Sequence, residues 1–368
     1  MSNIIYDVWF SAKLINRQDV YNKMLLKYGN SEKAFELFDE TDLDTFSLKE
    51  QKELLKKDIS VAEKIIKKSE KDNISIINRD SMYYPNLLKY IDSAPAVLYV
   101  KGNVEKLLDV KVTVIGSRQC DKDGITNAKR FSRAFTDVGL TVVAGFAPGI
   151  EATVHKAALS TIVIMPCGIN ITYPATHFRL KNMVLDNGGL IVTEYPFDVK
   201  AYKENFKFRN RLLAAFSDAT VFVQCGLKSG TAHTFNWTAV YGRDAYVIPG
   251  SINSIFCQGS NGYIKEGGIL ITCPEDVLVD YFTRYPELIY KEEAQCVEKV
   301  QEPQSFDIPG LSENEERILH ILAKNKLHID QIIKETNLSA SDISVGLINL
   351  EILDIIEKCE GNIYKIKY

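Results

Sequence analysis

The stretch that decides the fold is KVTVIGSRQCDKDGITNAKRFSRAFTDVGLTVVAGFA, residues 111–147. Its two apolar runs, 112–117 and 140–145, are continuous rather than alternating, which is typical of strands buried on both faces. Between them, from Asp123 to Val138, apolar residues recur at helical spacing. The members of this helical series are Ile125, Ala128, Phe131, Phe135 and Val138. Strand, helix and strand in this order predict a doubly wound α/β sheet.

The same pattern continues outward from this stretch. Further apolar runs lie at 161–167, 189–194, 219–224, 245–250 and 269–273. They predict an α/β fold with a Rossmann-like, mainly parallel sheet core, and we assign this domain to residues 81–283.

The two ends differ in character from this centre. Residues 1–80 are expected to form an N-terminal helical domain, with helices at 33–38 and 48–69. Residues 284–311 are polar and contain prolines, as expected of a linker. Residues 312–368 predict three helices followed by a hairpin around Gly361, the winged-helix pattern, with a capping box of Ser312 and Glu315.

Composition limits the function classes. Of the 368 residues, 46% are hydrophobic and 25% are charged, which excludes wholesale disorder. The formal net charge is −4, so a nucleic-acid site has to be a local patch. Seven cysteines without a CxxC pair favour free thiols in a reducing compartment. The sequence shows neither a signal-peptide pattern nor an apolar run of about 20 residues, so we expect a cytoplasmic protein without a membrane segment.

Two loops after predicted strands carry phosphate-binding chemistry. Gly116, Ser117 and Arg118 end the first strand before a helix, where loop amides and a hydroxyl suit a phosphate. Gly145 and Gly149 bracket the second turn, and Glu151 and His155 share a helix face beyond it. We place no third metal ligand near this pair, so structural hydrogen bonds are favoured over a metal. Neither loop has the GxGxxG or GxxxxGK[ST] spacing.

The segment 205–224, NFKFRNRLLAAFSDATVFVQ, is the sharpest polar cluster. Arginines interleaved with aromatic residues supply both the charge and the stacking surface that single-stranded nucleic acid needs. Its basic and amide members are Lys207, Arg209, Asn210 and Arg211. The alternative is that an arginine pairs with a carboxylate and both phenylalanines are core.

Two later loops extend this predicted site. Ser229, Gly230 and Thr231 provide a second small, hydroxyl-bearing helix start. A loop at 259–261 is predicted to face the same way. Since no GxSxG elbow occurs, a hydrolase triad is disfavoured.

These motifs follow one another in the order seen in the DNA-processing protein A (Smf) family. VTVIGSR, LTVVAGFAPGIEATVHKAAL, IMPCGINITYPATHFRL, GLIVTEYP, NFKFRNRLLAAFSDATVFVQ, KSGTAHT, VIPGSI and QGSNGYIKEGG carry the resemblance. It covers roughly residues 5–366 and is strongest between 112 and 278. The N-terminal region resembles the family's sterile-alpha-motif-like (SAM-like) helices, and the tail resembles its winged-helix domain.

The resemblance implies a non-enzymatic recombination mediator without a cofactor. Such a protein binds single-stranded DNA, dimerises through the Rossmann-like domain and loads the RecA recombinase during natural transformation. The positions that match the family's pocket are Gly116, Ser117, Arg118, Gly145, Gly149, His155, Lys156, Arg209, Asn210, Arg211, Ser229, Gly230 and Thr231.

The chain also departs from the family pattern. Pro148 stands where relatives usually have arginine, Glu151 stands where they have aspartate, and the connection around 159–165 is shorter. Loss of that arginine removes one expected phosphate contact. The segment 16–19 replaces a glycine-containing hairpin of relatives, which puts any DNA contact by that hairpin in doubt.

Other functions remain open at this point. The chain resembles nucleotide-monophosphate phosphoribohydrolases of the lysine-decarboxylase-like group at Ser229–Thr231, but their PGGxGTxxE motif lacks its glutamate here. A nucleotide-binding regulator is a further alternative. From residue 312 to 368 we count 7 Lys/Arg against 10 Asp/Glu, a net charge of −3. We therefore predict that the winged helix is a protein-interaction or regulatory module rather than a reader of duplex DNA.

Overall fold

A computed structural model describes residues 4–158, 160–288, 311–322, 327–336, 338–353, 355–359 and 362–367. The chain divides into two compact units, Met1–Glu292 and Glu293–Tyr368. The predicted boundary at residue 80 falls inside the first unit, and most of the predicted linker 284–311 lies outside the described residues.

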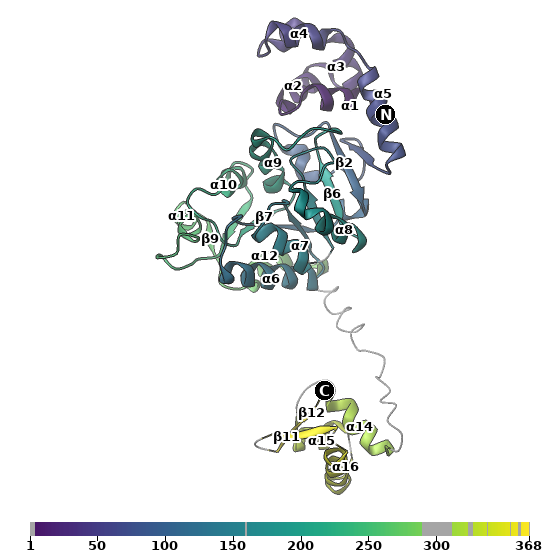
Figure 1. The fold of residues 1–368 in the computed structure, drawn as a ribbon, viewed down its shortest axis with the longest axis vertical. Coiled ribbons are helices and arrows are strands. Elements are labelled where there is room, and N and C mark those ends of the chain that lie inside the picture. Colours follow the sequence, from purple (N-terminus) through teal and green to yellow (C-terminus); the bar gives the residue numbers. More distant parts are fainter. Residues whose placement is uncertain are drawn as a thin grey trace. The chain divides into compact units, whose positions relative to one another are not determined.

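One large sheet organises the first unit (Figure 1). Its order is β1-β2-β6-β5-β4-β3-β7-β8-β9; β1 and β2 pair antiparallel and β2 joins β6 antiparallel, while all other pairs are parallel. The Rossmann-like, mainly parallel core is therefore confirmed. The strands are β1 Ser75–Asn78, β2 Val97–Gly102, β3 Lys111–Ile115, β4 Thr141–Ala144, β5 Thr161–Ile164, β6 Leu190–Thr193, β7 Ala219–Phe222, β8 Asp244–Val247 and β9 Ile269–Leu270.

Helices cover both faces of this sheet because alternate strand residues point to opposite sides. Val114 of β3 packs with one set of helices, whereas its neighbour Ile115 packs with the other. The first set is α6 Lys122–Asp137, α7 Ile150–Ala158 and α12 Glu275–Arg284, and the second is α9 Lys203–Ala215, α10 Thr231–Val240 and α11 Gln258–Lys265. Helix α8, Phe178–Asp186, packs beside α7 and contributes to a third cluster with the N-terminal region.

Local signals explain why the predicted helix α6 forms where it does. The Asp121 side chain caps its N-terminus by accepting from the Gly124 amide at 3.0 Å. Phe131 and Phe135 lie buried on the face toward the sheet. The chain then turns at Gly139, whose φ of +84° is the left-handed conformation that glycine adopts without strain.

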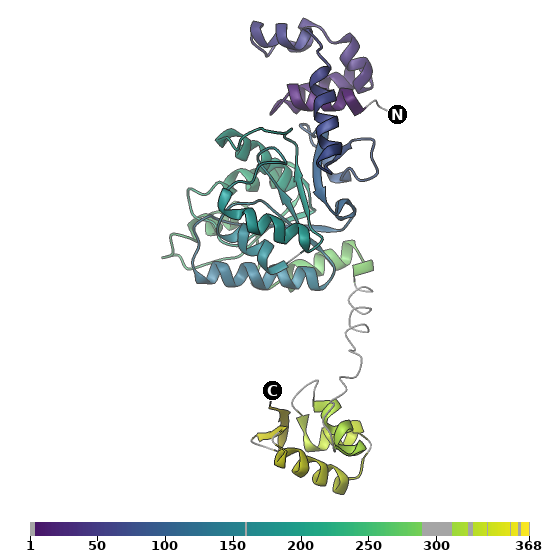
Figure 2. The same cartoon turned by 45° about the vertical axis from the view of Figure 1, so that its right-hand side comes forward.

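The N-terminal region is helical before it enters the sheet (Figures 1 and 2). Its helices are α1 Ile4–Lys13, α2 Gln18–Tyr28, α3 Ser31–Leu37, α4 Leu48–Leu55 and α5 Ser60–Lys71. The single helix predicted over 48–69 is wrong, since it is two helices. Lys57 adopts a left-handed φ of +49°, and the Asp58 carboxylate accepts from the Ser60 amide to start a new helix.

The second unit has the predicted winged-helix elements. Helices α14 Glu313–Leu322, α15 Ile329–Thr336 and α16 Ala340–Ile352 precede strands β11 Ile356–Cys359 and β12 Ile363–Ile366. The capping box is present, because the Ser312 amide donates to Glu315 and the Glu315 amide donates back to the Ser312 hydroxyl. A short strand that the sequence did not predict, β10 Leu327–His328, completes the small sheet. Within the described residues of the chain, no helix is long and apolar enough to cross a membrane.

Candidate functional site

A pocket of about 710 Å³ opens at the carboxyl end of the parallel strands. Residues 116–119 follow β3, residues 226–231 follow β7, and Ile255, Phe256 and Gln258 lie beyond β8; all of them line the pocket. The chain builds β4, β5 and β6 on one side of β3, then crosses to build β7, β8 and β9 on the other. The pocket thus lies at the topological switch point, where open α/β sheets bind ligands.

Close packing of two loops shapes one wall of the pocket. A Cβ on Gly116 would clash with Ile150, and a Cβ on Gly149 would clash with the carbonyl groups of Ser117 and Arg118. The buried Ser117 hydroxyl accepts from the Gly226 amide at 3.0 Å and so joins the loops after β3 and β7. Gly116, Gly149 and Ser117 therefore fix the wall, and Arg118 next to them is exposed at the pocket.

Arg209 is a buried cation in the pocket wall with unused hydrogen-bond donors. Its side chain is only 2% exposed, and Nε and Nη1 have no hydrogen-bond partner in the described structure. Burial lowers the pKa of Arg209, and the charge of nearby Glu151 opposes that shift. Gly145 makes room for this arrangement, since a Cβ there would clash with Arg209 Nη1 and Glu151. Unpaired buried donors are costly, so this guanidinium is set up for an anionic ligand.

An aromatic ring stands between the two pocket arginines. The guanidinium carbons of Arg118 and Arg209 lie 5.1 and 5.8 Å from the centroid of the Phe206 ring. Tyr173 meets the same ring edge-on at 5.5 Å and is itself 42% exposed. This group combines positive charge with flat aromatic surface.

The start of α10 forms the opposite wall. Ser229 accepts from both the amide and the hydroxyl of Thr231, which orders the first turn, and Asn210 donates to the Gly230 carbonyl from α9. Thr234, one turn into the helix, also lines the pocket, and its Oγ1 is buried without a partner among the described residues. A helix N-terminus and an unused hydroxyl together suit a negatively charged group.

Six predicted site residues are not among the residues that line the pocket: Gly145, Gly149, His155, Lys156, Lys207 and Arg211. His155 is fully buried, with ring nitrogens 2.7 Å from the Thr161 hydroxyl and 2.6 Å from the Gly145 carbonyl. Burial lowers the pKa of His155 to about 4, so the ring is neutral at pH 7 and structural. Lys156 and Lys207 are exposed outside the pocket lining.

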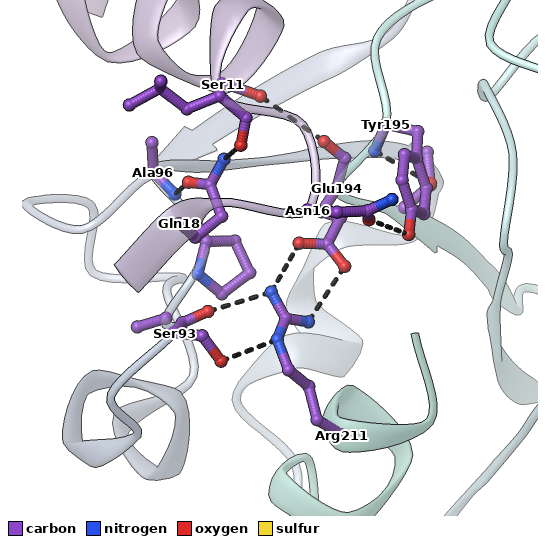
Figure 3. A network of polar contacts seen from close by, with 12 residues as sticks. Ser11, Asn16, Gln18, Ser93, Ala96, Glu194, Tyr195 and Arg211 are labelled. Carbon is purple, nitrogen blue, oxygen red and sulfur yellow. Dashed lines mark hydrogen bonds and ion pairs between the residues drawn. The ribbon is translucent and has the colours of Figure 1, made fainter. Parts of the chain in front are cut away.

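Arg211 does not line the pocket. Its guanidinium is fully engaged with Glu194 and Ser93 (Figure 3). It is 0% exposed, and Nη1 and Nη2 donate to the Glu194 carboxylate at 2.9 and 2.6 Å. Nε donates to the Ser93 hydroxyl at 2.8 Å, and Nη2 also donates to the Ser93 carbonyl. The structure does not bring Arg211 to the other predicted residues, because its donors are used up by a carboxylate and a turn. For this arginine, the carboxylate-pairing alternative describes the observed geometry.

The same network ties α9 to the N-terminal helices (Figure 3). The Ser11 hydroxyl donates to the Glu194 carbonyl at 3.4 Å, and the Tyr195 hydroxyl donates to the Asn16 side chain at 2.8 Å. Asn16 in turn donates to Asn205 in the first turn of α9 at 3.0 Å. The helix that carries Arg209 is thus held on its other side by residues far away in the sequence.

Sequence reasoning misplaced one loop and missed several lining residues. The predicted loop 259–261 is the first turn of α11, where Ser260 is fully buried and accepts from the Cys225 amide. Gln258, just before it, lines the pocket instead. The lining residues that were not predicted as site residues are Ile115, Gln119, Ala147, Glu151, Phe206, Gly226, Leu227, Lys228, Thr234, Ile255, Phe256 and Gln258. Their position after successive strands was the available signal, and Phe206 already stood out beside the arginines.

The fold and the site together define a Rossmann-like protein with a pocket for an anionic ligand. The family model for DNA recombination-mediator protein A matches residues 75–282, more than half of the chain, and the model for the DprA winged helix domain matches residues 302–362. The chain therefore belongs to the DNA recombination-mediator protein A family.

Individual relatives agree with this assignment. Protein Smf of Escherichia coli is 33% identical over 213 residues, which span 57% of each chain, and DNA processing protein DprA of Streptococcus pneumoniae is 33% identical over 54% of this chain and 71% of its own. The X-ray structure of the S. pneumoniae protein superposes with a TM-score of 0.64 at 28% identity, covering 76% of this chain and 98% of that one. A Helicobacter pylori DNA processing protein A, described for its single-stranded DNA binding mode, superposes with a TM-score of 0.54 at 26% identity, covering 58% and 97%.

Proposed function

We propose that the pocket binds single-stranded DNA and that the chain acts as a recombination mediator. The observation that carries this proposal is Arg209, a buried guanidinium that lines the pocket with two nitrogens that have no hydrogen-bond partner among the described residues. A phosphate oxygen is the acceptor that such a group lacks. The H. pylori relative, whose description names single-stranded DNA, adds support.

The pocket chemistry suggests how a strand would lie. Phosphates contact Arg209, Arg118 and the N-terminal turn of α10, while a base stacks on Phe206. Because these contacts are mainly to the backbone, binding is independent of base sequence and weakens steeply with salt. The pocket supplies this charge locally, which reconciles DNA binding with a net charge of −4.

Arg211 has a positioning role in this scheme. Its bonds to Glu194 and Ser93 hold the inner side of α9, so that Arg209 is presented on the pocket side. The residue therefore acts on DNA through α9 rather than by contact.

The wider role follows the family. We propose that the chain loads RecA onto DNA in the cytoplasm during natural transformation and acts as a homodimer. Self-association is supported by β9, the strand at one edge of the sheet, where Ile269 and Leu270 are about half exposed. An edge strand with apolar side chains is a ready surface for a second copy.

A binding role without catalysis is favoured over hydrolysis. In the PGGxGTxxE motif the glutamate stands three residues after the threonine, and here that position is Thr234, which carries no carboxylate. A mononucleotide-binding regulator would use the same pocket, and a competition experiment distinguishes this function from DNA binding. A regulator is saturated by a mononucleotide and binds oligonucleotides weakly.

The test is fluorescence anisotropy of a labelled oligothymidylate across a salt series. Arg209→Met and Arg118→Ala are compared with Arg133→Ala, which removes an exposed cation from α6 outside the pocket lining. We expect the pocket variants to bind at least tenfold more weakly and to show a shallower salt dependence, while Arg133→Ala binds like the unmodified chain. Equal affinity of all three variants would remove the pocket as the binding site.

A further inference from the structure

In the described part of the second unit, the outer face of helix α16 is apolar and exposed. Ile343, Leu347 and Leu350 point into the core of this unit. On the opposite side, Val345 is 58%, Ile348 55% and Ile352 75% exposed, and Leu353 follows at 54%. The spacing of three and four residues puts Val345, Ile348 and Ile352 on one stripe of the helix. Four large apolar side chains exposed at one helix are a signature of an interaction surface.

Acidic residues flank this stripe on both sides. At 100° per residue, Asp342 lies on one side of the stripe and Glu351 on the other. Helix α16 contains neither lysine nor arginine. In a winged helix the corresponding third helix reads a duplex groove only if cations meet the phosphates. The face therefore repels DNA and favours a protein.

We propose that the α16 stripe docks a basic amphipathic helix of a partner protein. An apolar strip with anchor positions at i, i+3 and i+7 matches the spacing of a helix that lies along it. The acidic flanks give attraction to lysine or arginine beside the partner's apolar face. A second copy of this unit is disfavoured, because it would bring Asp342 and Glu351 of both copies together.

The probe is a labelled leucine–lysine peptide whose leucines follow helical spacing, titrated into the full chain. Ile348→Gln/Ile352→Gln removes the stripe and keeps helix-forming residues at exposed positions, so that the fold is retained. Asp342→Asn/Glu351→Gln removes only the flanking charges. Leu26→Gln, an 89% exposed leucine in α2, is the matched apolar control, and a scrambled peptide of the same composition controls for charge alone.

We expect the stripe variant to weaken peptide binding at least tenfold, which corresponds to about 1.4 kcal/mol. The charge variant loses affinity mainly at low salt, while Leu26→Gln binds the peptide normally and the scrambled peptide does not bind. Three outcomes overturn the proposal: binding unchanged in the stripe variant, a fall in molecular mass of the stripe variant that shows the face to be a homodimer contact, or loss of duplex-DNA binding in that variant. Binding of oligothymidylate stays the same in every variant, so this test is independent of the DNA pocket.

Discussion

We expect Arg209→Met and Arg211→Met, made one at a time, to differ in their effect on stability. The residues stand two positions apart in α9, and methionine keeps much of the aliphatic volume of both while removing the guanidinium. Within the part of the chain that the structure describes, Nε and Nη1 of Arg209 are buried without a hydrogen-bond partner, whereas every nitrogen of Arg211 is bonded.

The magnitudes follow from these contacts. A buried unsatisfied polar group costs about 1–3 kcal/mol, so Arg209→Met leaves the free energy of unfolding unchanged or raises it by up to about that amount. The lost attraction to Glu151 offsets part of the gain. Arg211→Met strands the Glu194 carboxylate inside the protein and lowers the free energy of unfolding by about 3–5 kcal/mol. A variant that loses DNA affinity but keeps its free energy of unfolding shows that the replaced residue serves ligand binding rather than the fold.

The assay combines urea unfolding, followed by tryptophan fluorescence, with anisotropy of labelled oligothymidylate. We expect Arg209→Met to be stable and to lose DNA affinity about tenfold to a hundredfold, as for the loss of a charged hydrogen bond of about 1.5–3 kcal/mol. We expect Arg211→Met to unfold at lower urea. The reasoning is refuted if Arg209→Met is as unstable as Arg211→Met and still binds DNA with the original affinity.

Four further outcomes are expected. Gly145→Ala pushes a methyl group into Arg209, so DNA affinity should fall about tenfold in the anisotropy assay. The control Gly188→Ala, at an open left-handed turn, should lower stability and leave DNA affinity unchanged. Thr234→Val removes a buried hydroxyl that has no partner among the described residues; it should weaken DNA binding and leave the urea midpoint equal or higher. The pKa of His155 lies at about 4 in the fold against an ordinary 6.5. The buried neutral ring therefore stabilises the fold fully above pH 6.5, and this contribution is lost as the pH falls toward 4. Urea unfolding should show about 2 kcal/mol less stability at pH 5 than at pH 7 from this residue, a difference absent in His155→Gln. A chain ending at residue 292, the end of the first unit, should keep its oligothymidylate affinity, and a large loss would assign DNA contacts to the winged helix.

The parallel core could be predicted because its signals are local. Each strand is a short apolar run, and the intervening helix α6 carries its own cap and its own apolar face. Strands β1 and β10 are different, because each exists only through antiparallel pairing with a partner further along the chain. The break between α4 and α5 was hidden for a related reason. Helical spacing continues across Lys57, and only the left-handed backbone there and the hydrogen bond from the Ser60 amide to Asp58 end one helix and begin the next.

The arginine pair of α9 marks the limit of sequence reasoning about the site. Residues two apart in a helix point about 200° away from each other, so periodicity alone excludes that Arg209 and Arg211 both face one pocket. Periodicity does not say which of them faces the pocket, because that choice depends on Glu194 at the end of β6 and on Ser93 in the segment before β2. Once these two groups satisfy Arg211, the opposite face of α9 is left to the pocket, where Arg209 Nε and Nη1 are buried without a hydrogen-bond partner among the described residues. The Arg211–Glu194 ion pair thus fixes one side of α9 and leaves Arg209 on the other side, where its guanidinium is suited to bind an anionic ligand.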